Sequence, residues 1–136
     1  MKKINFIKLK MIKNINGLLL VFEKYKRFNI KRIFSITAKK NSLRGQHAHK
    51  KCNQILIVPQ GKIEVNLTNG KLKKKIILNS SSKALHIKPM IWASQKFLLS
   101  NSVLLVICDQ NYSENDYIRK FEKYLKIKNN DKKNSN

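Results

Sequence analysis

Short runs of alternating apolar and polar residues occur along most of the chain and predict β-strands. The clearest run is residues 63–67, Ile-Glu-Val-Asn-Leu, which has the period of two that is typical of a half-buried strand. Asn69-Gly70 follows at once and predicts a hairpin, because both central residues of a tight turn adopt positive φ. Further strand-like runs occupy residues 18–23, 29–37, 53–58, 72–78, 84–88, 90–94 and 103–109.

The C-terminal region has a different pattern from the rest of the chain. Turn signals recur about every eight to twelve residues before it, which predicts an antiparallel sandwich or barrel. After them, Ser113 is predicted to cap a helix whose apolar face is formed by Tyr117, Phe121, Tyr124 and Leu125. We therefore predict an all-β domain with a short C-terminal helix.

The length of the chain fits one domain with polar ends. It has 136 residues, of which 42% are hydrophobic, enough for a core. Residues 1–13 are basic and are expected to form a leader or an edge strand. Residues 14–127 are expected to be the folded domain. Residues 128–136 are all polar, and we expect them to be disordered.

The charge of the chain is strongly positive. Lysine and arginine together number 30 and acidic residues number 7, so the formal net charge is +23. All but four of the cations are lysine, spread over nearly every segment, whereas sites that read bases favour arginine and aromatic residues. A solvated lysine-rich surface is one interpretation. A site for a polyanion, or for an anion as small as a diphosphate, is the other. We expect no specific nucleic acid as a partner.

Several other classes of protein do not fit the sequence. The longest apolar run, residues 18–22, is far shorter than the roughly 18–20 residues that span a bilayer. The charged N-terminus lacks the apolar region of a signal peptide. Cys52 and Cys108 lie far apart in the sequence and are expected to be reduced packing residues. We therefore expect a cytoplasmic protein without membrane contact.

The segment from Arg44 to Lys50 is the one that could perform chemistry. His47 and His49 are two residues apart, so in a strand both rings lie on one face. They could be metal ligands, a proton-transfer pair or a structural polar pair. A metal site in a small β-barrel needs a carboxylate a few residues later, but Asn53 and Gln54 occupy those positions. We therefore expect no metal.

Proton transfer needs no further ligand. Histidine has an unperturbed pKa of ~6.5, close to operating pH, and an adjacent imidazole disfavours double protonation. One of the two rings, His47 or His49, could then remain neutral as a base while the other donates. Arg44 would supply a fixed positive charge for a phosphate or a developing enolate oxygen.

These motifs resemble those of a known family, the WxcM-like sugar-nucleotide 3,4-ketoisomerases, which have a cupin fold. The resemblance covers roughly residues 14–125 and includes Arg-Gly-x-His-Ala-His-Lys-Lys at 44–51 and Gln-Ile-Leu at 54–56. Further segments similar to the family's strands, hairpin and closing region are residues 28–34, 61–65, 69–71, 85–92, 102–106 and 112–119. The resemblance implies a single cupin-like β-sandwich, or jelly roll.

The resemblance also implies an activity and a set of site residues. The keto group of dTDP-4-keto-6-deoxyglucose would move from C4 to C3 through an enediolate, on the way to 3-amino-3,6-dideoxyhexoses for surface polysaccharide. His47 would be the base and His49 its partner, while Arg44, Gln54 and Trp92 would contact the substrate. The family implies no cofactor or metal, and a homodimer with exchanged N-terminal strands.

Three positions depart from the family pattern. Asn16-Gly17 replaces the usual Arg-Gly, Phe34-Ser35 replaces two tyrosines, and Ala93-Ser94 replaces a more polar pair. The sequence is compatible with an active isomerase, with a catalytically weak cupin that binds a sugar nucleotide or serves as a subunit, and with a polyanion-binding β-barrel. Either epimer at C4 and several nucleotide bases also remain compatible with it.

Overall fold

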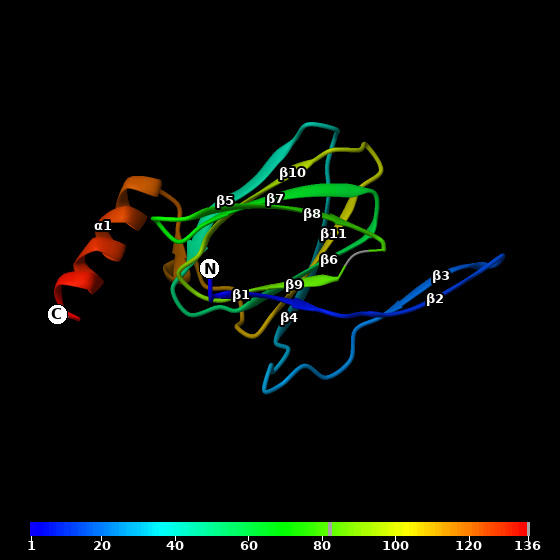
Figure 1. Ribbon diagram of the computed structural model, residues 1–136, viewed down its shortest axis with the longest axis horizontal. Coiled ribbons are helices and arrows are strands. Elements are labelled where there is room, and N and C mark those ends of the chain that lie inside the picture. Colours follow the sequence, from blue (N-terminus) through cyan, green and yellow to red (C-terminus); the bar gives the residue numbers. More distant parts are fainter. Residues whose placement is uncertain (82, 136) are drawn as a thin grey trace.

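The chain folds as two antiparallel sheets packed face to face. The computed structural model describes residues 1–81 and 83–135 (Figure 1). The first sheet has the order β1 (Ile4–Ile7), β9 (Ala84–Ile87), β6 (Gln54–Gln60), β11 (Val103–Cys108), β4 (Arg32–Thr37). The second has the order β12 (Tyr117–Ile118), β5 (Leu43–His49), β10 (Trp92–Phe97), β7 (Lys62–Thr68), β8 (Lys73–Asn79). The predicted all-β sandwich with a C-terminal helix is confirmed.

The core lies between the two sheets and follows from the alternation in the sequence. Val65 of β7 and Leu56 of β6 are among the apolar side chains that point inward, and both are almost completely buried. In β6 the neighbours Ile55 and Ile57 are buried as well, on the opposite face of the sheet. The segment 22–28 covers that face, which is why β6 is a continuous apolar run instead of an alternating one.

The predicted hairpin at Asn69-Gly70 connects β7 to β8, but its turn is longer than a two-residue turn. Residues 69–72 form the loop, and Thr68 pairs with Lys73. Only Gly70 of the two predicted turn residues has a positive φ, +93°. The side-chain Oδ1 of Asn69 accepts hydrogen bonds from the backbone N–H groups of Lys71 and Leu72 at 3.0 and 2.8 Å, so the asparagine stabilises the turn through its side chain.

The C-terminal helix differs from the prediction at both ends. Helix α1 spans Phe121–Lys133, and the preceding Glu114–Asp116 form a 3₁₀ turn followed by strand β12. Tyr117 pairs with His49 of β5, so this segment extends the sheet before any helix begins. The helix also continues through most of the segment predicted to be disordered from residue 128, with Lys132 and Lys133 in its last turn, where cations are favourable. Residue 136 lies outside the described residues.

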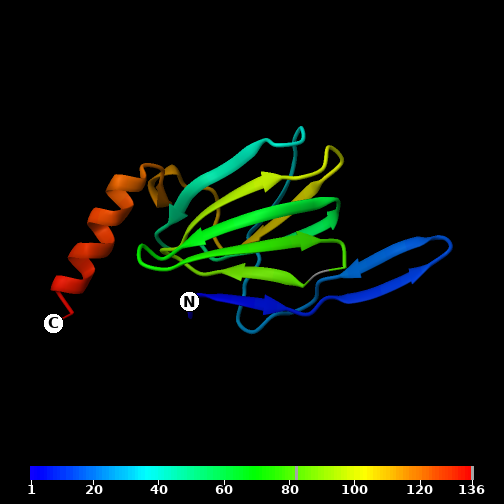
Figure 2. The same ribbon diagram turned by 45° about the horizontal axis from the view of Figure 1, so that its top comes forward.

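The N-terminal region is built from strands. β1 pairs with β9 at the edge of the first sheet, so of the two alternatives for residues 1–13 the edge strand holds for residues 4–7. The next strands, β2 (Lys10–Asn14) and β3 (Gly17–Val21), pair only with each other among the described strands and project from the sandwich (Figure 2). Cys52 and Cys108 are buried free thiols, as predicted. None of the described helices is long and apolar enough to cross a membrane.

Candidate active site

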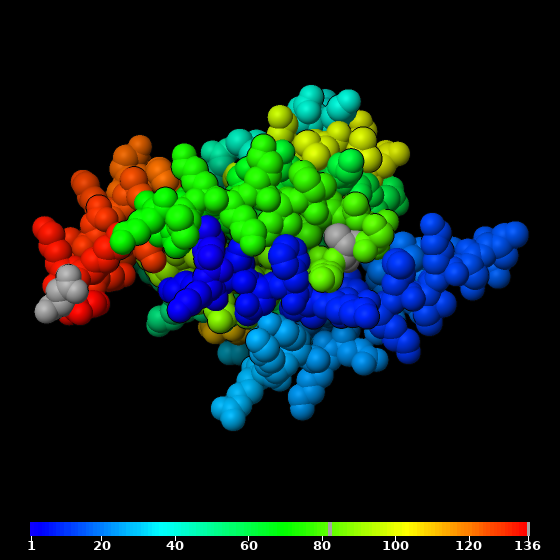
Figure 3. Space-filling model, in the orientation of Figure 1, coloured from blue at the N-terminus to red at the C-terminus, as the bar shows by residue number. Residues whose placement is uncertain are grey.

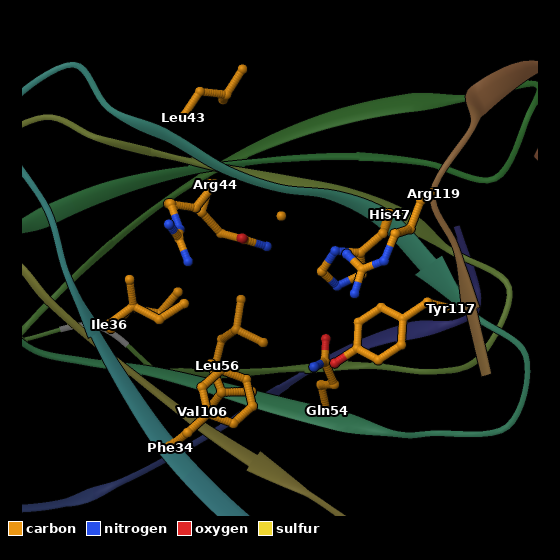
Figure 4. Close-up of a pocket in the computed structure, with 13 residues that line it drawn as sticks. Phe34, Ile36, Leu43, Arg44, His47, Gln54, Leu56, Val106, Tyr117 and Arg119 are labelled. Atoms are coloured by element: carbon orange, nitrogen blue, oxygen red, sulfur yellow. The ribbon is translucent and has the colours of Figure 1, made fainter. Parts of the chain in front are cut away.

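A cavity of about 420 Å³ opens between the two sheets. One side of it is apolar and includes Phe34, Leu56 and Val106, and the other is polar (Figure 4). His47, Tyr117 and Arg119 gather at one end of the polar side (Figure 4). The complete lining is Phe34, Ile36, Leu43, Arg44, Gly45, His47, Gln54, Leu56, Gln95, Leu104, Val106, Tyr117 and Arg119. Three predicted site residues, Arg44, His47 and Gln54, therefore share one cavity.

A β-bulge in β5 brings Arg44 and His47 to the same cavity although their spacing is odd. Ala93 of β10 pairs with His47 and the next residue pairs with Gly45, so Gln46 is the extra residue of β5. Gly45 and Gln46 both have positive φ, +79° and +59°. A Cβ on Gly45 would lie 2.5 Å from Oε1 of Gln95, so that side chain would have to shift, and the positive φ is the stronger reason for glycine there. The bulge reverses the alternation once and thereby aims Arg44 into the cavity.

His47 is held neutral by its surroundings. Burial, and to a smaller extent the neighbouring His49 ring, lower its pKa to about 4. The two rings are edge to face, with centroids 5.0 Å apart. Nδ1 of His47 is buried and has no hydrogen-bond partner in the described part of the chain. The ring is therefore a neutral imidazole at neutral pH.

His49 lies beside His47 and is fixed by a carboxylate. Its Nδ1 lies 2.9 Å from Oδ2 of Asp116, and because a carboxylate only accepts, Nδ1 carries the hydrogen. Oδ1 of Asp116 accepts a hydrogen bond from the backbone N–H of Lys51 at 2.7 Å, which fixes the carboxylate in turn. Nε2 of His49 is left as a buried acceptor without a partner among the described residues. Burial lowers the pKa of His49, and Asp116 opposes this shift.

Tyr117 and Arg119 are site residues that the sequence analysis did not identify. It placed Tyr117 on the apolar face of a helix, whereas β12 places the ring against both histidines, with centroids 4.9 Å from His47 and 4.4 Å from His49. The Arg119 guanidinium lies 4.2 Å from the centre of the Tyr117 ring and is paired with Glu114. One short segment supplies Asp116, Tyr117 and Arg119. The sequence signal that could have identified it is the presence of polar residues among the apolar ones of the predicted helix.

Arginine is concentrated at the cavity. Arg44 and Arg119 line it, and Arg32 lies directly behind, with Nη2 3.3 Å from the Tyr117 hydroxyl oxygen. Three of the four arginines in the chain are therefore at this site, while no lysine is among the lining residues that the structure describes. Nη2 of Arg32 also lies 3.6 Å from Sγ of Cys108, whose pKa is lowered to about 6, chiefly by a hydrogen bond from Cys52. The amide of Gln54 contacts the same sulfur at 3.7 Å.

Trp92 lies away from the cavity, contrary to the expectation that it contacts the substrate. It precedes Ala93, the residue of β10 that faces the interior, so the alternation of the strand turns Trp92 to the outer face of the sheet. There it packs against Phe121 and Tyr124 of α1, with centroids 5.1 and 5.7 Å apart. Trp92 is therefore placed as a packing residue for the helix.

His86 is also separate from the cavity. Its Nε2 lies 2.9 Å from Oδ1 of Asn53 and its Nδ1 lies 3.4 Å from the Tyr25 hydroxyl, on the outer face of the first sheet. Because the Asn53 amide nitrogen donates to Asp109, its oxygen is free to accept from His86. Burial lowers the pKa of His86 to about 4. Its partners make it a structural histidine.

One group of side chains has the composition of a metal site. A ring nitrogen of His49, Sγ of Cys52 and a carboxylate oxygen of Asp116 lie within 4.8 Å of one another. Imidazole, thiolate and carboxylate are all ligands of Zn²⁺. However, Asp116 already accepts hydrogen bonds from His49 and from the backbone N–H of Cys52, and the pKa of the Cys52 thiol is raised by its hydrogen bond to Cys108. These contacts favour a hydrogen on His49 Nδ1 and on the Cys52 thiol over a bound metal ion.

Comparisons with known proteins agree on one family. The family model described as "FdtA: WxcM-like, C-terminal" matches residues 2–129. The TDP-4-oxo-6-deoxy-α-D-glucose-3,4-oxoisomerase of Aneurinibacillus thermoaerophilus is 35% identical over 128 residues, which cover 92% of this chain and 90% of that protein.

Solved structures give the same result. The sugar 3,4-ketoisomerase QdtA of Thermoanaerobacterium thermosaccharolyticum, in complex with TDP, is 34% identical with a TM-score of 0.87, over 94% of this chain and 96% of that one. WlaRA of Campylobacter jejuni, a TDP-fucose-3,4-ketoisomerase, is 36% identical with a TM-score of 0.82, over 93% and 96%. A mutant of QdtA was solved with TDP-4-keto-6-deoxyglucose, at a TM-score of 0.87 and 34% identity over 93% and 94%.

Proposed function

The chain belongs to the WxcM-like family of sugar 3,4-ketoisomerases, and from this premise we propose that it moves the keto group of a dTDP-linked 4-keto-6-deoxyglucose from C4 to C3. The observation that carries this proposal is a neutral histidine in a cavity lined by arginine. Such a cavity suits a sugar bearing a diphosphate, because the guanidinium group matches phosphate oxygens and the imidazole can accept a proton.

The proposed reaction begins with proton abstraction by His47. The C3 hydrogen is acidic because it lies next to the C4 carbonyl, and its removal forms an enediolate. A base must be unprotonated to accept this proton, and the lowered pKa of His47 keeps it so at neutral pH. The ring belongs to the polar side of the cavity, where it can meet the C3 hydrogen of the substrate.

His49 is proposed to be the second member of the proton-transfer pair. The Asp116 carboxylate fixes the hydrogen on Nδ1, so Nε2 is the nitrogen that can accept or return a proton. The ring is in edge contact with His47, and the negative charge of Asp116 would stabilise the imidazolium that forms transiently. Reprotonation at C4 with loss of the proton from the C3 hydroxyl then completes the isomerisation without an oxidant or a reductant.

Arg44 is proposed to bind the diphosphate. It lies on the same polar side as His47 but three residues earlier, at the far side of the bulge (Figure 4). Because Arg44 and His47 lie apart along the polar side, Arg44 can hold the phosphates while the sugar reaches His47. Gln54, which lines the same cavity, is proposed to contact the sugar (Figure 4). The product is proposed to serve the synthesis of 3-amino-3,6-dideoxyhexoses.

The N-terminal hairpin supports a dimer. Its apolar side chains Met11, Ile12, Leu18 and Leu19 are exposed, and Ile15 at its tip is fully exposed. Figure 3 shows this hairpin as a projection beyond the body of the molecule. Exposed apolar residues on strands with free edges favour pairing with another chain. We propose that the hairpin packs on a second copy, which would make the strand exchange that the family resemblance implies.

The test is proton NMR of the purified protein with dTDP-4-keto-6-deoxyglucose in D₂O. We expect deuterium at C3 together with a 3-keto product, and the coupling at C4 identifies the epimer. His47→Asn should abolish both signals while the thermal midpoint and the affinity for dTDP stay near those of the wild type. A folded wild-type protein that gives neither deuterium exchange nor product contradicts the proposal and favours the binding-module hypothesis. Activity that chelators abolish and metal restores contradicts the acid–base mechanism.

A further inference from the structure

Tyr117 is the only hydroxyl-bearing side chain among the described residues that line the cavity. All other lining side chains are apolar or carry imidazole, amide or guanidinium groups. The Tyr117 ring is in contact with the rings of both His47 and His49, and Figure 4 shows it beside His47. Position 34, where the resembling family usually has a tyrosine, is Phe34 here, and its ring belongs to the apolar side of the same cavity. A phenol donor in this cavity must therefore come from β12.

The hydrogen bond to Arg32 fixes which way the Tyr117 hydroxyl points. Nη2 of Arg32 lies 3.3 Å from the Tyr117 oxygen, and arginine only donates, so the oxygen accepts. The hydroxyl hydrogen must therefore be donated elsewhere, and no acceptor for it is found in the described part of the chain. Tyr117 thus presents a free O–H donor in a cavity whose base is neutral.

The position of Tyr117 is held by charged groups on two sides. Arg32 lies between the rings of Phe34 and Tyr112, at 5.1 and 5.4 Å from their centres, and contacts Sγ of Cys108. On the other side, the Arg119 guanidinium stacks on the Tyr117 ring and is itself paired with Glu114. Both contacts fix the ring before a substrate binds, which is the condition for electrostatic stabilisation of a transition state.

Building on the proposed function, we propose that Tyr117 is a catalytic residue that donates its hydroxyl hydrogen to the C4 oxygen of the substrate as the enediolate forms. When His47 removes the C3 proton, the electron pair of the C3–H bond becomes the C3=C4 double bond, and the carbonyl electrons move to the C4 oxygen. The hydrogen bond from Tyr117 stabilises that negative charge. Arg32 is a positioning residue, because it reaches the substrate only through the tyrosine.

The test compares Tyr117→Phe with Tyr25→Phe. Tyr25 is a matched control because its hydroxyl contacts the structural His86 on the outer face of the first sheet, outside the cavity lining. We expect Tyr117→Phe to lower kcat about 10²-fold, within the usual range for a positioned acid–base group, with dTDP affinity changed less than about twofold. The rate of C3 deuterium exchange should fall by the same factor, since enolisation is the affected step. Tyr25→Phe should retain wild-type rates.

Two results would overturn the assignment while leaving the proposed function intact. One is a Tyr117→Phe enzyme whose kcat stays within about threefold of the wild type. The other is unchanged C3 exchange with loss of product, which would place Tyr117 at reprotonation instead. A wild-type enzyme without exchange or product would contradict the proposed function itself. Arg32→Lys adds a further readout: it should lower kcat in the presence of Tyr117 and have little further effect in the Tyr117→Phe background.

Discussion

His49 and Asp116 are 67 residues apart in the sequence, yet Nδ1 of one lies 2.9 Å from Oδ2 of the other. The contact exists because strand β12, which follows Asp116 directly, pairs with the end of β5 and so places the carboxylate beside the His49 ring. The same carboxylate accepts hydrogen bonds from the backbone N–H groups of Lys51 and Cys52, so it also fixes the turn that follows the His-Ala-His segment. One side chain thus holds both the ring and the loop behind it.

Asp116→Asn should therefore impair catalysis more than binding. The asparagine oxygen can still accept from the backbone of Lys51, but its amide nitrogen would face Nδ1 of His49 and favour the tautomer with the hydrogen on Nε2. We expect kcat to fall about 10²-fold or more with dTDP affinity little changed, and the thermal midpoint to fall only slightly, through loss of the Cys52 N–H bond to Oδ2. Steady-state kinetics and calorimetry measure both quantities. Asp131→Asn, at an exposed position of α1, is the control. Equal kcat in the two variants would contradict the role of Asp116.

The sequence predicts much of this site because its strands alternate regularly. Period-two alternation correctly placed His47 and His49 near each other, and the hairpin signal located β7 and β8. Alternation along one strand cannot predict the bulge at Gly45-Gln46, because an extra residue is defined only by the pairing with the partner strand β10. Tyr117 was assigned to a helix because its spacing from Phe121 also fits a helical face. The pairing of β12 with β5 is a long-range contact that outweighs that local pattern.

The activity should persist to unusually low pH for a histidine base. The pKa of His47 is lowered to about 4 by burial and by His49, so the neutral base survives well below 6.5. The acid limb of kcat/KM reports groups of the free enzyme. We expect kcat/KM to change less than about twofold between pH 7.5 and 6. Measurement of initial rates across this range tests the expectation. A loss of half the activity near pH 6.5 would mean that the base is not desolvated.

The free energy of unfolding should decrease as the pH falls below about 6.5, and His86 should contribute to this decrease. Its folded pKa is about 4, lowered by burial and by Lys88 and Lys26, whereas in the unfolded chain it is ~6.5. Between these values the unfolded state binds more protons, so the free energy of unfolding decreases as pH falls from 6.5 to 4, by at most about 3 kcal/mol from this residue. Urea denaturation of the wild type and of His86→Gln at pH 7 and 5 should show a smaller decrease in the variant. Equal decreases would contradict this assignment.

Arg44 should contribute to affinity for the nucleotide diphosphate. Arg44→Ala removes a charge from the polar side of the cavity, and we expect about a 10-fold or greater loss in dTDP affinity, because a charge-assisted hydrogen bond to phosphate contributes about 1.5–3 kcal/mol. Titration calorimetry at physiological salt measures it. Arg27→Ala is the matched control, since Arg27 is exposed and outside the cavity lining. Equal losses in both variants would mean that only the net charge of the protein matters.

The exposed hairpin should determine the oligomeric state. Leu19 lies on β3 opposite Ile12 of β2, and both side chains are about half exposed in the single chain. If a second copy covers them, Leu19→Glu places a charge in an apolar interface, whereas it is nearly neutral on a free surface. Analytical ultracentrifugation should find a wild-type dimer and a largely monomeric Leu19→Glu variant.

Lys13→Glu controls for the change of charge on the same hairpin, because Lys13 is a polar position on the neighbouring strand. It should remain dimeric. Circular dichroism of each variant verifies that the sandwich is folded, since the hairpin contributes little to the core. A monomeric wild type, or a Leu19→Glu variant that dimerises as tightly as the wild type, would show that the hairpin is not the contact between copies.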